Sequence, residues 1–258
     1  VAAGYVKRIA FYKKIDGDFE GALAALLRLE GIWRGLGERR EIAGVVSSQV
    51  TELTSLGRWD EADVKFDEAI KIAIALGDRV LEADILMTGA NACGLRSDYD
   101  CALVRARQAV SMREALGDKK KLATAMGDLG KLLSSAGHLD EAIKTLERVA
   151  AMEEKAKDWT GLAGTQVNLG AAYRERGDPV RALALYRKAE AEFAKLPAFA
   201  RFRAVAIANI GNTYLALGLP EKALEHHERA LAIKRRVANK RELAQSLFDM
   251  ARVLSSLK

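Results

Sequence analysis

The chain has 258 residues, half of them apolar, which is enough for one long domain or two short ones with a substantial core. Lys and Arg exceed Asp and Glu by 41 to 35, and the resulting charge of +6 is intermixed with acidic residues. This pattern is unlike the dense basic patch of a dedicated nucleic-acid binder. Three prolines against 21 glycines favour helices that end at glycine over a β-rich fold.

The first predicted element, like those that follow, belongs to a repeat. GDFEGA begins at residue 17, and related hexapeptides begin at 57, 97, 137, 177 and 218, spaced 40, 40, 40, 40 and 41 residues apart. The sixth residue is always alanine, at Ala22, Ala62, Ala102, Ala142, Ala182 and Ala223. A second mark, Leu-Gly-Glu/Asp-Arg/Lys, begins at residue 36 and recurs from residues 76 and 116. The predicted repeats therefore span 3–37, 38–77, 78–117, 118–157, 158–198 and 199–238.

Each segment between two marks has helical periodicity. Within 163–176, one face of a helix is formed by residues at spacings of three, six, seven and ten, namely Ala163, Gln166, Leu169, Gly170 and Tyr173. Glycine after a helix accepts the left-handed conformation, and the following Asp suits a helix start. The sequence therefore predicts an all-α chain of six antiparallel helix pairs, stacked as one α-solenoid domain over 1–258. A C-terminal capping helix is expected at 241–257, with Ala244, Leu247, Ala251 and Leu254 on its apolar face.

Targeting signals and cysteines bear on location. No stretch is apolar for the length of a membrane span and no signal peptide is present, so we expect a cytoplasmic chain. Because it starts at Val1 rather than methionine, we expect a fragment of a longer protein. Cys93 and Cys101 are expected to be two small packed side chains in a reducing compartment, rather than a disulfide or redox pair.

Two further observations argue against catalysis. Ser134, His138 and Asp140 lie within one copy of the repeated turn, and neighbouring copies hold other residues at the position of His138. No phosphate-binding glycine loop, metal cluster or convergent catalytic set is found. We therefore expect no enzyme activity, no cofactor and no metal.

The repeat resembles the tetratricopeptide repeat, whose first helix carries Leu-Gly followed by an aromatic and whose second helix carries spaced alanines. The best unit supplies Leu169, Gly170, Tyr173, Gly177, Ala182, Tyr186 and Ala189. The unit is 40 residues rather than the usual 34, as in kinesin light chains, polarity adaptors and bacterial regulatory proteins. Residues 83–96 depart from the pattern, with Ala90 and Cys93 where glycine and an aromatic are expected. The resemblance implies a right-handed superhelix that binds a protein or peptide.

The resemblance also implies a concave binding face, lined by the first helix of each pair. Carried onto this chain, its candidate partner-binding residues are Ser48, Thr51, Thr88, Asn91, Asp128, Lys131, Asn168, Arg174, Asn209, Asn212, Asp249 and Arg252. Asn168 and Asn209 share one repeat position, and a carboxamide can both donate to and accept from a peptide bond. We therefore expect a ladder that holds an extended partner segment largely irrespective of its side chains.

Two functions follow from this expectation. The first is a binding scaffold that forms the adaptor or sensor part of a larger signalling protein. The second is a bacterial regulator that binds a short signalling peptide and changes its curvature. Basic residues after the inter-repeat turns, such as Arg40 and Lys120, could instead mark a stripe for an acidic partner or nucleic acid. Because acidic residues offset them and no aromatic platform accompanies them, we do not expect nucleic acid as a partner. The oligomeric state is left open.

Overall fold

The computed structural model describes residues 2–237 and 240–257, and the described part is all-helical. The chain divides into two compact units, Val1–Ala136 and Gly137–Lys258. The predicted all-α architecture of consecutive helix pairs is confirmed. The sequence predicts a single domain over 1–258, whereas the structure divides the chain into these two units. The boundary between the units falls within the fourth predicted repeat, 118–157.

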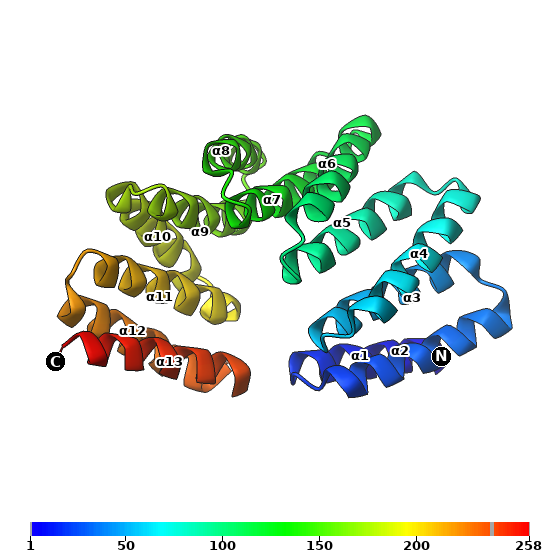
Figure 1. The fold of residues 1–258 in the computed structure, drawn as a ribbon, viewed down its shortest axis with the longest axis horizontal. Coiled ribbons are helices and arrows are strands. Elements are labelled where there is room, and N and C mark those ends of the chain that lie inside the picture. The colour runs from blue at the N-terminus through cyan, green and yellow to red at the C-terminus, as the bar shows by residue number, and fades with distance from the viewer. Residues whose placement is uncertain (1, 238–239, 258) are drawn as a thin grey trace. The chain divides into compact units, whose positions relative to one another are not determined.

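The first unit contains seven α-helices within its described residues. They are α1 (Ala2–Ile15), α2 (Phe19–Leu36), α3 (Arg39–Ser55), α4 (Trp59–Leu76), α5 (Arg79–Leu95), α6 (Tyr99–Leu116) and α7 (Lys119–Ser135). Neighbours along the chain pack side by side, and first helices also touch, as α3 touches α5 and α5 touches α7. The blue to green helices of Figure 1 show these pairs.

The second unit is built in the same way within its described residues. It contains α8 (Leu139–Lys155), α9 (Trp159–Glu175), α10 (Pro179–Ala194), the 3-10 helix η1 (Pro197–Phe199), α11 (Ala200–Ala216), α12 (Pro220–Val237) and α13 (Lys240–Ser256). These are the green to red helices of Figure 1, and η1 accompanies the longer turn before α11.

The helix boundaries follow the local chemistry expected from the sequence. Gly137 lies just before α8 with φ +82°, a conformation that costs other residues a close contact with Cβ. The side chain of Asp178 accepts a hydrogen bond from the backbone N–H of Arg181 and so caps α10. Ser97 and Lys157 adopt the same positive φ where other repeats have glycine. Turn geometry is therefore retained even where the glycine is lost.

The repeated alanines mark the closest helix crossings. All six are at most 3% exposed, and their small side chains let neighbouring helices pack closely. In the second unit the core between α9 and α10 joins Leu169, Tyr173 and Tyr186, as the aromatic signature predicts.

The prediction for the C-terminal helix was wrong in its orientation. The expected apolar face of α13 is exposed, with Leu247 at 53% and Leu254 at 47%, whereas Ser246 and Val253 are buried. The exposed face corresponds to the one that α11 packs against α12, where Ile207 and Ile210 are buried. The helix α13 therefore resembles the first helix of a further pair, with its signature face uncovered among the described residues. Two residues expected on its other faces, Arg241 and Glu242, have side chains outside the described set.

Candidate functional site

A groove in the first unit lies between α5, α6 and α7, with a volume of about 340 Å³. It is lined by Ala83, Asp84, Met87, Thr88, Asn91, Arg113, Lys121, Thr124, Ala125 and Asp128. Most of these residues are polar, and both signs of charge are present. The groove therefore suits a polar chain with hydrogen-bonding groups better than an apolar anchor.

Three of the residues predicted from the sequence meet in this groove. Thr88 and Asn91 come from α5 and Asp128 from α7, because corresponding faces of successive first helices lie next to one another. The predicted Lys131 lies one turn further along α7, and its Nζ is 2.5 Å from Oδ1 of Asp128. This pair neutralises one negative charge at the rim.

Arg113 and Asp84 were missed by the sequence analysis. The guanidinium of Arg113 is 3% exposed, forms an ion pair with Asp84 and donates to the backbone carbonyl of Val80 across 3.1 Å. It holds the start of α5 against α6 and places a charge at one side of the groove. The corresponding repeat positions hold the buried, apolar Ala73 and Phe193 but also the charged Glu153 and Lys234, so the repeat did not single out Arg113.

The predicted residues of α3 lie near a different cavity of the first unit. Ser48 lines a cavity of about 390 Å³ between α1, α2 and α3, and its hydroxyl donates to the carbonyl of Gly44. Thr51 is half-buried. Glu52 is 2% exposed in this cavity, and its Oε1 lies 2.9 Å from Nζ of Lys14. The structure therefore separates Ser48 from the groove of α5, α6 and α7.

The second unit carries the predicted carboxamide row. Asn168 on α9 and Asn209 on α11 are half-buried at corresponding positions, and the two helices touch. Asn212 and Arg174 are also half-buried and lie further along these helices. Within the part of the chain that the structure describes, the carboxamides of Asn91, Asn168, Asn209 and Asn212 make no hydrogen bond. Their donors and acceptors are available to a ligand.

The last two predicted residues lie on α13. Asp249 is half-buried and Arg252 is exposed, with Nη1 of the arginine 4.0 Å from Oδ1 of the aspartate. At this distance and exposure the ion pair contributes little to stability.

Basic residues near the inter-repeat turns are in part engaged by carboxylates. Nε of Arg40 lies 2.7 Å from Asp78, and Nη1 of Arg79 lies 2.9 Å from Glu82. Lys121, by contrast, is exposed at the groove. These pairs support the interpretation of the stripe as an offset surface charge.

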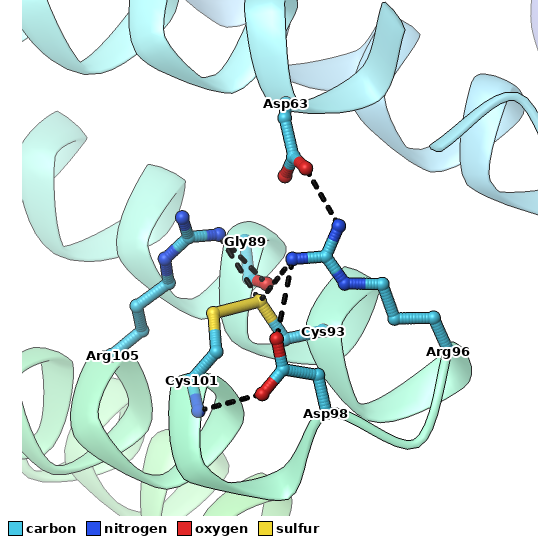
Figure 2. The surroundings of a disulfide bond; sticks show 7 residues. All are labelled: Asp63, Gly89, Cys93, Arg96, Asp98, Cys101 and Arg105. Atoms are coloured by element: carbon cyan, nitrogen blue, oxygen red, sulfur yellow. Dashed lines mark hydrogen bonds and ion pairs between the residues drawn. A yellow bond between two sulfur atoms is a disulfide. The ribbon is translucent and has the colours of Figure 1, made fainter. Parts of the chain in front are cut away.

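The cysteine prediction was wrong. Cys93 and Cys101 form a disulfide that joins the end of α5 to the start of α6, with the Cα atoms 5.9 Å apart (Figure 2). Their spacing of eight residues spans the tight turn of a repeat, so a residue in the last turn of one helix faces a residue in the first turn of the next. Together with Asp98, the two cysteines form the one group of potential metal ligands found among the described residues.

None of the described helices has the length and hydropathy needed to cross a membrane. The consecutive helix pairs, buried crossing alanines and polar first-helix faces together define an α-helical repeat protein.

Comparison with known proteins identifies the repeat. Residues 122–191 and 203–258 match the model of the tetratricopeptide repeat, and these regions belong to this family. Proteins of this family generally serve as scaffolds for protein interactions rather than as enzymes. No protein with a curated description matches the chain in sequence.

Solved structures share the fold at low sequence identity. BtubC (BKLC) from P. vanneervenii is 20% identical with a TM-score of 0.71, covering 84% of this chain and 91% of that protein. A STAND signal-transduction ATPase with a tetratricopeptide repeat sensor from Pyrococcus horikoshii is 14% identical with a TM-score of 0.70, covering 98% and 41%. A Rap protein complexed with competence and sporulation factor is 14% identical with a TM-score of 0.67, covering 98% and 74%.

Proposed function

We propose that the chain is a protein- or peptide-binding scaffold whose first-helix faces hold an extended segment of a partner. The observation that carries this proposal is the set of four asparagine carboxamides without internal partners on α5, α9 and α11. Polar side chains that already form hydrogen bonds with one another would have few donors and acceptors left for a ligand. These carboxamides keep both a donor and an acceptor for it.

The recognition chemistry follows from the geometry of the peptide bond. Each bond of an extended segment presents one N–H and one C=O, and a carboxamide can accept from the first while donating to the second. Because these contacts involve the backbone, they tolerate many partner sequences. Asp84 and Asp128, with Lys121 at the same groove, would add a preference for charged side chains of the partner.

The comparisons support a place in signalling. The fold is shared with the sensor-bearing ATPase and with the Rap protein in complex with its factor, although identity is too low to carry over their partners. We propose that this chain is the adaptor or sensor part of a larger regulatory protein. The expected cytoplasmic location, the absence of catalysis and the absence of nucleic-acid binding remain predictions.

A second candidate is a regulator that binds a short signalling peptide and changes its curvature. The similarity to the structure of NprR in complex with its cognate peptide NprX favours it, with 12% identity, a TM-score of 0.66 and coverage of 99% and 74%. This candidate predicts a change in radius of gyration by solution X-ray scattering when peptide is added. A rigid scaffold predicts the same radius with and without peptide.

The binding proposal is tested by selecting ligands from a phage-displayed library of random peptides. A selected peptide is then titrated by fluorescence anisotropy against the Asn168→Ala, Asn209→Ala double variant and the Asn91→Ala variant. Each lost carboxamide is expected to weaken binding about tenfold, corresponding to about 1.4 kcal/mol, if the peptide contacts that unit. Thermal unfolding should hardly change, because these carboxamides hold nothing within the described chain.

The matched control is Gln108→Ala, which removes an exposed carboxamide from the second helix α6. It should leave affinity unchanged. Peptide binding that survives the loss of all three asparagines, or that is lost with Gln108, would refute the proposed face.

A further inference from the structure

The disulfide between Cys93 and Cys101 has one buried and one accessible sulfur. Cys93 is 1% exposed, and Cys101 is half-buried at the first turn of α6. An external thiol therefore reaches Cys101 more easily than Cys93. In thiol–disulfide exchange, attack at one sulfur releases the other as a thiolate, so the expected leaving group is Cys93.

Two guanidinium groups lie next to this leaving group (Figure 2). Nη1 of Arg105 is 3.3 Å from Sγ of Cys93, and Nη2 of Arg96 is 4.0 Å from the same atom. Arginine stays charged at any physiological pH, and a neighbouring cation stabilises a thiolate. The surroundings of Cys93 thus favour its release from the disulfide.

The same charges argue against a metal ion at Cys93, Asp98 and Cys101. One carboxylate oxygen of Asp98 accepts from the backbone N–H of Cys101 across 3.2 Å, and the other lies 3.4 Å from Arg96. A divalent cation would compete with these contacts and would be repelled by both guanidinium groups. The cluster is suited to a sulfur anion rather than to a cation.

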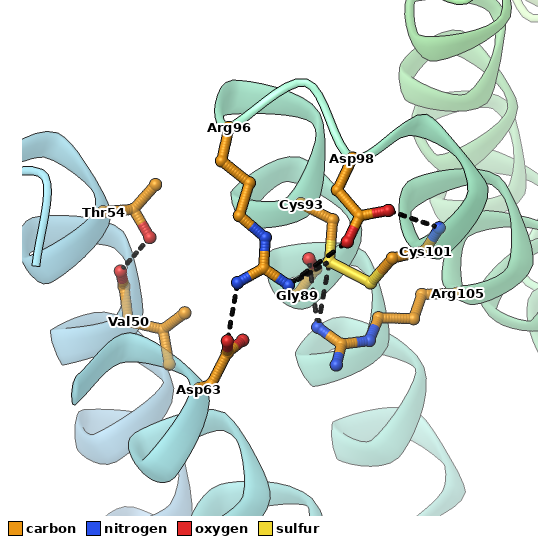
Figure 3. A network of polar contacts seen from close by, with 9 residues as sticks. All are labelled: Val50, Thr54, Asp63, Gly89, Cys93, Arg96, Asp98, Cys101 and Arg105. Atoms are coloured by element: carbon orange, nitrogen blue, oxygen red, sulfur yellow. Dashed lines mark hydrogen bonds and ion pairs between the residues drawn. A yellow bond between two sulfur atoms is a disulfide. The ribbon is translucent and has the colours of Figure 1, made fainter. Parts of the chain in front are cut away.

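The two arginines also contact the preceding helix α4, and Figure 3 shows the link from Arg96 to Asp63. Nη1 of Arg96 is 2.6 Å from Asp63, and the guanidinium carbon of Arg105 lies 3.8 Å from the centre of the Phe66 ring. Arg105 also donates to the carbonyl of Gly89 on α5 across 3.4 Å. A change at the sulfur atoms therefore acts on groups that hold α5 and α6 against α4.

We propose that Cys93 and Cys101 form a site of reversible thiol–disulfide exchange that controls the packing of α5 and α6 against α4. The reductant is a low-molecular-weight thiol such as glutathione. Its thiolate attacks Sγ of Cys101, which forms a mixed disulfide and releases Cys93 as a thiolate beside Arg105. A second thiolate then attacks the glutathione sulfur, which releases Cys101 and leaves oxidised glutathione. Each protein thiolate takes up a proton as the pH requires, and two electrons pass to the protein.

This inference concerns a modification site and is independent of the proposed peptide binding. Thiol-linked pairs in reducing compartments are typically transient and sensing, whereas persistent disulfides belong to oxidising ones. A purely structural disulfide would resist glutathione until the protein unfolds. The two cases therefore differ in whether glutathione reduces the disulfide while the chain is folded.

The test equilibrates the purified chain with graded mixtures of reduced and oxidised glutathione and alkylates the free thiols for mass spectrometry. We expect the folded protein to pass from disulfide to dithiol across the series, with the transient glutathione adduct on Cys101. Hydrogen exchange should become several-fold faster in α4 and α5 on reduction and stay unchanged in α9 to α12. Resistance to excess glutathione, an adduct on Cys93 or unchanged exchange would overturn the proposal.

Two variants distinguish the effect of Arg105 on release of the Cys93 thiolate from a general effect on stability. Arg105→Gln should slow reduction several-fold, because the Cys93 thiolate loses its nearest cation. The matched control is Arg176→Gln, since Arg176 lies 4.9 Å from the Tyr173 ring centre and 3.2 Å from Asp140, in the unit whose sequence contains no cysteine. Equal reduction rates in the two variants would refute the leaving-group assignment. Tight zinc binding by the reduced wild type would assign a metal site and overturn the exchange site.

Discussion

Gly170 and Gly211 occupy the same repeat position in α9 and α11, and each faces a ring of the following helix. An added Cβ on Gly170 would lie 2.6 Å from the Tyr186 ring, and one on Gly211 would lie 2.9 Å from the His227 ring. Tyr186 is fully buried, and burial raises the pKa of its hydroxyl to about 12. The signature glycine is thus required for close packing of the ring and not for a turn.

Replacing this glycine should cost packing energy. We expect Gly170→Ala to lower the free energy of unfolding by about 1–3 kcal/mol, because the methyl group overlaps a buried ring. Urea unfolding followed by circular dichroism measures the change. Gly164→Ala on the same helix is the control, since its Cβ would contact nothing within 4 Å. A gain of about 0.5–1 kcal/mol is expected there, and equal effects at both sites would contradict the packing role.

His227 occupies the repeat position that Tyr186 has in the preceding pair. It makes the stability of the pair of α11 and α12 depend on pH. It is 2% exposed and its Nε2 has no hydrogen-bond partner. Burial lowers its pKa below 6.5, with Asp249 opposing the shift and Lys234, His226 and Arg252 adding to it. The unfolded chain therefore binds a proton at a higher pH than the folded chain. The contribution of His227 to stability is present above about pH 6.5 and is lost as pH falls through this range.

The His227→Phe variant should remove this dependence. Between about pH 6.5 and 5 the wild type should lose stability relative to the variant, at no more than about 1.4 kcal/mol per pH unit. Chemical unfolding at a series of pH values measures the difference. His226→Gln changes the neighbouring, half-buried imidazole and should keep the wild-type slope. A pH profile of His227→Phe parallel to that of the wild type would be the contrary result.

At the scale of elements, periodicity predicted the succession of α-helices, because glycine, alanine and aspartate at fixed spacing each have a local physical role. The sequence could not show which face of α13 is buried. That face depends on whether another helix covers it, and an apolar stripe looks the same in either case. The disulfide and the Arg113–Asp84 pair were also missed, since both depend on side chains of neighbouring helices meeting in space.

Because of the orientation of α13, substitutions at Leu247 and Val253 should differ in their effect on the free energy of unfolding. Leu247→Gln should change the free energy of unfolding by less than about 0.5 kcal/mol, because Leu247 is 53% exposed. Val253→Ala should cost about 2 kcal/mol, because Val253 is fully buried. Differential scanning calorimetry of both variants measures this. A larger loss at Leu247 would show that its face is covered in solution.

At the scale of the whole molecule, one 40-residue pattern generates both units, and the polar residues of the first helices repeat with it. The repeat predicts which positions of each first helix face a ligand, and this stays a prediction. It could not predict the groove of α5, α6 and α7, which arises from the sizes and charges of particular residues such as Arg113. Binding by carboxamides that hold a peptide backbone is the claim on which the functional proposal depends.

A double-mutant cycle between Asn168 and the peptide backbone tests this claim most directly. A selected peptide is compared with versions N-methylated at single peptide bonds, each titrated against the wild type and Asn168→Ala. The account predicts that one N-methyl position and the variant each weaken binding, with a coupling energy of about 1 kcal/mol between them. Strictly additive losses at every position would show that Asn168 does not hold the peptide backbone.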